Sequence, residues 1–177
     1  KQKFMYYFNM VLDSLENTTD YVLIYEYATC IHEMLKEIDY WVKQSSQVTA
    51  GAGLVKPFGA SKTSTGGNLL DFGLSDQAID GEDQIKMSIE IHQNGINYLR
   101  TFQVVCQKLS GLFNSFNVPN LVWKMVNFLA FILEKNTESA VQLIECLKQL
   151  NIIKLLNLNS EQVHDALIDM LKQLLAH

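Results

Sequence analysis

The chain has 177 residues, of which 48% are hydrophobic, which is enough apolar material for a folded domain with a substantial core. Its formal net charge is −5 and Arg100 is its only arginine. Arginine is the residue that forms bidentate hydrogen bonds to phosphates and guanine bases, so the chain has almost none of this capacity. Composition therefore argues against a nucleic-acid reader. The longest apolar run, residues 128–133, is much shorter than the ~20 residues of a membrane span, so we expect no membrane insertion.

The first predicted helices cover residues 3–15 and 20–43, with Thr18, Thr19 or Asp20 as the candidate cap between them. A third helix is predicted over 82–116, where Asn94 and Gly95 favour a break or kink. The remaining predicted helices are 120–135, 138–156 and 160–176, the last of them capped by Ser160.

Residues 45–81 interrupt the helical pattern. They hold most of the glycines, Pro57 and many serines and threonines, so we expect a long loop inserted between helical pairs. Loops beyond about 12–15 residues are uncommon in compact domains and are usually functional or mobile. The segment contains Asp71-Phe72-Gly73, the metal-binding triplet of protein kinases, but the other kinase motifs are missing from the chain.

Two segments near the C-terminus echo one another. Residues 121–135 and 162–176 start 41 positions apart, and each has apolar residues at i, i+3, i+4, i+7, i+8 and i+11, which is one face of a helix. A helical unit that recurs at ~40–47 residues is typical of armadillo and HEAT arrays. The matched positions are Val122, Met125, Val126, Leu129, Ala130 and Leu133 in the first segment and Val163, Ala166, Leu167, Met170, Leu171 and Leu174 in the second.

The last third of the chain resembles an armadillo-type unit, because a long helix, a second helix, a short helix and another long helix follow one another from Asn120 onward. Trp123 and Asn127 resemble the Trp and Asn that lie four residues apart in the third helix of importin-α-like repeats. The resemblance implies a concave groove in which the Asn hydrogen-bonds an extended peptide and the Trp packs against its side chains. The pair occurs once, since His164 and Ile168 occupy the matching positions of the last helix.

Patterns that would support catalysis or metal binding are incomplete. Glu161 and His164 form half of a di-iron helix motif, but no second such pair exists in the chain. Lys62-Thr63 is preceded by Ser61 where a phosphate-binding loop needs glycine. We therefore expect no catalytic residues, no metal ligands and no cofactor.

The three cysteines lie far apart, each on an apolar helical stripe, at Cys30, Cys106 and Cys146. This spacing favours buried free thiols in a reducing compartment over a disulfide framework. We therefore expect a cytoplasmic protein, with the nucleus as the alternative.

Together these patterns predict an all-α fold, a right-handed α-α superhelix of armadillo- or HEAT-like repeats with a long inserted loop. Residues 1–177 would form one helical-repeat domain or a segment of a larger solenoid. The expected function is a non-catalytic scaffold for a protein or peptide partner, within a larger assembly. Its predicted binding residues are Trp123, Asn127, Phe128 and Phe131, because Leu121 to Leu133 is apolar on more than one side and is either buried between layers or covers an interface. The alternatives are a compact helical bundle that regulates or oligomerises a larger protein, and an enzyme that uses the long loop as a lid.

Overall fold

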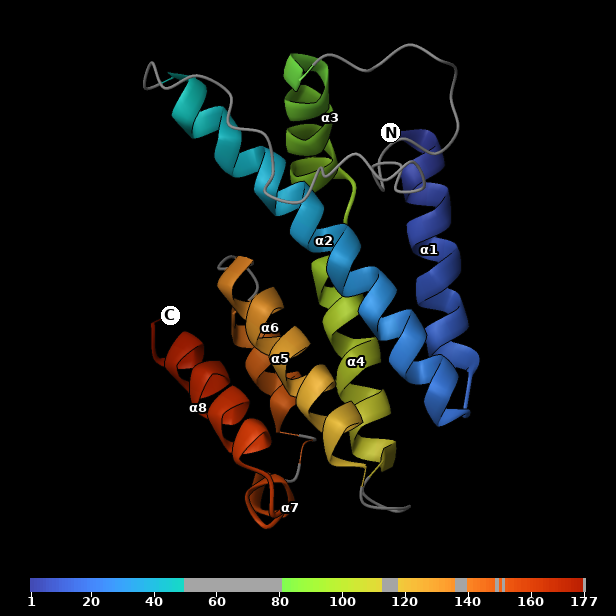
Figure 1. Cartoon of the computed structure of the whole chain (residues 1–177), viewed down its shortest axis with the longest axis vertical. Helices are drawn as coiled ribbons and strands as arrows, with labels where there is room; N and C mark the ends of the chain where they lie inside the picture. The colour runs from blue at the N-terminus through green and yellow to red at the C-terminus, as the bar shows by residue number, and fades with distance from the viewer. Residues whose placement is uncertain (50–80, 113–117, 136–139, 149, 151, 177) are drawn as a thin grey trace, which may run out of the picture. The chain divides into compact units, whose positions relative to one another are not determined.

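The computed structural model describes residues 1–49, 81–112, 118–135, 140–148, 150 and 152–176. All regular structure in these residues is helical, which confirms the all-α prediction (Figure 1). The helices are α1 (Gln2–Asn17), α2 (Tyr21–Thr49), α3 (Gly81–Asn94), α4 (Tyr98–Leu112), α5 (Pro119–Lys135), α6 (Ala140–Leu147), α7 (Ile152–Leu156) and α8 (Glu161–Leu175). None of them combines the length and the apolar character needed to cross a bilayer.

Asp20 is the cap that starts α2. Its Oδ1 accepts hydrogen bonds from the backbone N–H groups of Val22 at 2.8 Å and Leu23 at 3.2 Å, which have no partner inside the helix. Ser160 starts α8 in the same way, because its side chain accepts from the N–H of Val163. Helix α8 therefore begins at its predicted cap, and α2 begins at Asp20, one of its three candidate caps.

The predicted loop does not begin at residue 45. Residues 45–49, which the sequence places in the loop, form the C-terminal end of α2. Gly81, also predicted in the loop, is the first residue of α3. The first strong helix breakers after Lys43 are Gly51, Gly53 and Pro57, so nothing ends the helix at residue 45. The remainder of the predicted loop, residues 50–80, lies outside the described residues.

The helix predicted over 82–116 is two helices, broken at the Asn94-Gly95 position. The N–H groups of Gly95 and Ile96 both donate to the carbonyl of Ile91, at 2.9 and 3.0 Å. A Cβ atom at Gly95 would lie 2.8 Å from that carbonyl oxygen, so glycine permits this tight exit from α3. The predicted helical span 138–156 consists of α6 and α7, which correspond to the second helix and the short helix expected after α5.

The chain forms two compact units. Unit 1 consists of Lys1–Met10 and His32–Ile96, and unit 2 of Val11–Ile31 and Asn97–His177. In unit 1, Lys1 Nζ pairs with Glu90 Oε1 at 2.5 Å, which joins the start of α1 to α3. The described apolar core of this unit includes Phe4, Phe8, Met34, Leu35, Ile38, Trp41, Ile85 and Ile91.

Unit 2 is organised around α5. This helix packs against α4 and α8, while α4 packs against α6 and α7 against α8. Figure 1 shows α5 and α8 running in the same direction, and α4 and α6 in the opposite one. The two helices that carry the sequence echo are thus neighbours in space. All six stripe residues of α5 are buried, whereas in α8 the first four are buried, Leu174 is half-buried and Leu171 is 37% exposed.

Candidate protein-binding surface

One edge of α5 remains accessible to solvent. Asn120 is exposed, and Trp123, Asn127 and Phe131 are half-buried. Their spacings of three, four and four residues place them along one face of the helix. We call these four residues the α5 edge. It contains three of the four residues that the sequence predicted as a binding surface.

The fourth predicted residue, Phe128, lies in the core instead. Its side chain is 0% exposed, so it presents nothing to a partner in this structure. A step of one residue from Asn127 turns the side chain by about 100° around a helix axis, and here that turn points it inward. The residues one turn away from it on this side, Lys124 and Ile132, are buried as well. The sequence left open whether this apolar side of α5 is buried between layers or covers an interface, and Phe128 is buried between layers.

The far end of the α5 edge carries charge. Lys135 Nζ lies 5.5 Å from the centre of the Phe131 ring, within cation–π range, and 2.6 Å from Glu134 Oε1. These contacts hold the ring of Phe131 in place without covering it fully. The far end of the α5 edge is therefore partly apolar and partly charged.

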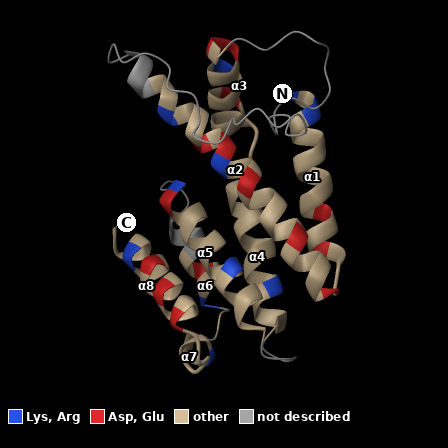
Figure 2. Ribbon diagram, viewed as in Figure 1, with Lys and Arg blue, Asp and Glu red and all other residues tan. Residues whose placement is uncertain are grey.

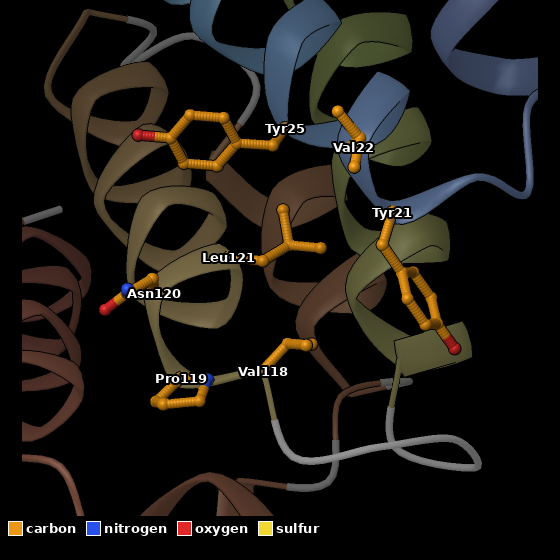
Figure 3. Close-up of a pocket in the computed structure, with 7 residues that line it drawn as sticks. All are labelled: Tyr21, Val22, Tyr25, Val118, Pro119, Asn120 and Leu121. Atoms are coloured by element: carbon orange, nitrogen blue, oxygen red, sulfur yellow. The ribbon is translucent and has the colours of Figure 1, made fainter.

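The near end of the edge opens into a groove of about 390 Å³ between the starts of α2 and α5 (Figure 3). Val22 is 68% exposed and Tyr25 37% exposed, whereas Leu121 is buried and forms the floor. Figure 3 shows Leu121 between the α2 side chains and Val118. Asn120 belongs to both the groove and the α5 edge. The complete lining is Tyr21, Val22, Tyr25, Val118, Pro119, Asn120 and Leu121.

The α2 half of this groove was not predicted from the sequence. Tyr21 and Tyr25 lie one turn apart, and with Val22 they fall outside the buried stripe that contains Ile24 and Ala28. Aromatic residues outside the buried face of an amphipathic helix indicate a binding surface, so Tyr21 and Tyr25 were the signal in the sequence. Their pairing with α5 was not predictable, because about a hundred residues separate the two sides.

Two ion pairs join the end of α1 to α4, and one hydrogen bond joins the turn before α2 to α4. Arg100 Nη2 contacts Asp13 Oδ1 at 2.5 Å and Glu16 Oε2 at 2.8 Å, and these hydrogen bonds raise the pKa of the guanidinium. Lys108 Nζ donates to the carbonyl of Thr18 at 2.7 Å. Burial lowers the pKa of Lys108, and the nearby charge of Glu16 opposes that shift. These contacts fix the point from which α2 departs, and so place Tyr21 and Tyr25 beside α5.

The groove and the edge offer binding chemistry. The polar groups of the lining and of the four edge residues are phenol hydroxyls and carboxamides, which both donate and accept hydrogen bonds, and the indole N–H of Trp123, which donates. In the part of the chain that the structure describes, no group of three or more His, Cys, Asp and Glu side chains is placed to hold a metal ion. The Asp71-Phe72-Gly73 and Lys62-Thr63 motifs lie outside that part.

Glu161 and His164, which form half of a di-iron motif, each have a structural role at the ends of α7 and α8. A ring nitrogen of His164 lies 3.0 Å from the carbonyl oxygen of Leu156, the last residue of α7. Carbonyl groups at the end of a helix lack intrahelical partners, so this contact completes α7. Glu161 is an exposed acid in the first turn of α8, where the helix dipole favours it.

Thiol reactivity should follow burial. Burial raises the pKa of Cys106 far above its usual value, with a further contribution from Cys146, and burial also raises the pKa of the more exposed Cys30. Near neutral pH, native protein treated with iodoacetamide should therefore be alkylated first at Cys30, and at Cys106 only as it unfolds. Peptide mass spectrometry over time measures this order. Alkylation of Cys106 in folded protein at a rate similar to Cys30 would contradict it.

Comparison of the chain with protein-family models, with curated proteins and with solved structures found no match.

Proposed function

We propose that this protein is a non-catalytic protein-binding scaffold built from stacked helical hairpins of the armadillo or HEAT kind. The observation that carries the proposal is the side-by-side packing of α5 and α8 in the same direction, with α4 and α6 running antiparallel to them. In helical-repeat proteins each hairpin packs on the next, equivalent helix against equivalent helix. The pairs α4–α5 and α6–α8 have that relation, because α4 packs against α6 and α5 against α8. Most residues of the two echoed stripes are buried.

The partner surface in this proposal is the groove together with the α5 edge. The groove accepts an apolar side chain against Val22, Tyr25 and Leu121. Beyond Asn120, the carboxamide of Asn127 is able to pair with a peptide backbone while Trp123 packs against its side chains, as the resemblance implies. The preferred ligand is therefore an extended segment with an apolar anchor. We place such a scaffold in the cytoplasm or nucleus, since its three cysteines are free thiols.

A regulatory or oligomerisation domain is the second candidate. It is favoured by a different observation, the exposed apolar residues of α8, which include Ile168 at 49% and Leu175 at 89% exposure.

The groove proposal is testable with peptides displayed on phage and selected on the immobilised protein. Val22→Glu should weaken binding of selected peptides at least tenfold, which corresponds to about 1.4 kcal/mol, because it buries a carboxylate against the bound side chain. Leu23→Glu is the matched control, since Leu23 is 42% exposed but does not line the groove. Both positions lie in the first turn of α2, where an acidic residue suits the helix dipole.

Trp123→Ala and Asn127→Ala test the edge in the same assay, and each should reduce affinity while circular dichroism shows unchanged helicity. Selection of no peptide family above the starting library, or equal binding by the Val22→Glu and Leu23→Glu variants, would overturn the assignment of this surface.

A further inference from the structure

Helix α8 has a second apolar face that unit 2 leaves uncovered. Ile168, Leu171 and Leu175 are 49%, 37% and 89% exposed, and their spacing of three and four residues makes a stripe along the helix. This stripe is distinct from the buried face that contains Val163 and Met170. In the part of the chain that the structure describes, α8 packs against α5 and α7, and its exposed apolar side favours a further neighbour.

The exposed stripe has the spacing of a helix-pairing seam. Glu161, His164, Ile168, Leu171 and Leu175 alternate steps of three and four residues, as the core positions of a coiled coil do. Asp165 and Lys172 follow His164 and Leu171 directly, and both are exposed. They therefore flank the seam on one side, in the positions that choose the partner of a helix by charge.

The charges of α8 are arranged unevenly along its length. Acidic residues lie in its first two thirds, at Glu161, Asp165 and Asp169, and Lys172 is its only lysine or arginine (Figure 2). If two α8 helices pack in parallel, the two copies of Asp165 lie on opposite sides of the seam, as do the two copies of Lys172, so neither residue meets an opposite charge. If they pack antiparallel with Ile168 of one helix against Leu171 of the other, Asp165 of each lies beside Lys172 of the other. A two-fold axis then forms the favourable pair twice.

We propose that the outer face of α8 binds the α8 helix of a second copy of this chain in an antiparallel, two-fold pair. The charge pattern is complementary to itself in that orientation alone, and the apolar stripe supplies the contact. In the isolated chain Lys172 pairs with Asp169 at 3.1 Å, but both side chains are largely exposed, so exchanging this partner costs little.

The length of the seam sets the expected strength. A helix of 15 residues is about 22 Å long, so a single helix pair covers less than the ~1,200 Å² of a standard stable interface. The association should therefore be reversible, with a dissociation constant in roughly the micromolar range. It uses residues other than those of the groove and the α5 edge, so its outcome is independent of peptide binding.

Sedimentation velocity over a concentration series tests the proposal on the full chain. The protein should pass from monomer to dimer with rising concentration, and Leu171→Glu should weaken dimerisation at least tenfold by placing a carboxylate in the seam. Leu23→Glu, an equal change at a comparably exposed leucine of α2, should leave the dimer unchanged. A monomer at all concentrations, or a dimer that survives Leu171→Glu, would overturn the proposal.

A charge exchange identifies the partner as a second copy and gives its orientation. In the Asp165→Lys dimer, lysine lies beside lysine in both 165–172 pairs. In the Lys172→Glu dimer, a carboxylate lies beside a carboxylate in both pairs. Each variant alone should therefore dimerise several-fold more weakly than wild type. A mixture of the two variants forms two favourable pairs and should recover association, as should the double variant alone. Added salt should shrink these differences. Failure of the mixture to associate better than either variant would refute the antiparallel pairing.

Discussion

Leu129→Ala is expected to lower the free energy of unfolding of unit 2 by about 2–5 kcal/mol. Leu129 is 0% exposed and belongs to the α5 stripe, and α5 packs against both α4 and α8. Truncation removes apolar contacts and leaves a cavity that neighbouring helices fill only in part. Because α5 is the helix around which unit 2 is organised, few positions should have a larger effect.

The measurement is urea unfolding followed by tryptophan fluorescence. The two tryptophans divide between the units, with Trp41 in unit 1 and Trp123 in unit 2, so a Trp41→Phe background reports on unit 2. Leu175→Ala, at a leucine that is 89% exposed, is the matched control and should change stability by less than about 0.5 kcal/mol in dilute protein. Equal effects of the two substitutions would contradict the packing of α5 described above.

Gly95→Ala is expected to destabilise unit 1 by about 1–3 kcal/mol, as overpacking in a fixed site does. The new Cβ would lie 2.8 Å from the carbonyl oxygen of Ile91 and 3.0 Å from the sulfur of Met5. The methionine side chain is able to move, but the carbonyl is held because it accepts hydrogen bonds from Gly95 and Ile96. The exit from α3 therefore has to change to admit a methyl group.

Gly111→Ala is the control for this change and should have the opposite sign. No atom lies within 4 Å of a Cβ built at Gly111, and the residue is an exposed position of α4. Alanine there should stabilise the protein by about 0.5 kcal/mol, because it restricts the unfolded chain and favours the helix. A Trp123→Phe background leaves Trp41 to report on unit 1 for Gly95→Ala. If Gly95→Ala were neutral or stabilising, the close approach to Ile91 would be wrong.

Local chemistry made much of the helical structure predictable. The carboxylate of Asp20 and the hydroxyl of Ser160 satisfy N–H groups within three residues of themselves, so their role depends on no distant part of the chain. The break at Gly95 is local for the same reason. The predicted start of the loop at residue 45 was wrong because the change of composition there includes no helix breaker before Gly51.

The candidate binding surface was predictable only in part. Periodicity places Trp123, Asn127 and Phe131 on one face of α5, and they do form its accessible edge. It could not show that Phe128 is buried, because an apolar residue beside a stripe faces either solvent or a second neighbour, depending on which helices surround it. The superhelical array and its binding function stay predictions, and the peptide selection tests the binding function.

The sequence by itself determined that the described chain is helical, where α2 and α8 start, and which face of α5 and of α8 is apolar, because these depend on capping and on a period of 3.6 residues. Only the tertiary structure decided that α5 and α8 are neighbours, that Tyr25 and Leu121 share a groove, and that Leu171 faces outward. Those facts depend on which apolar faces meet, and the hydrophobic effect that drives them together is not directional. A stripe of leucines therefore predicts that a helix will be covered, and the fold selects its partner.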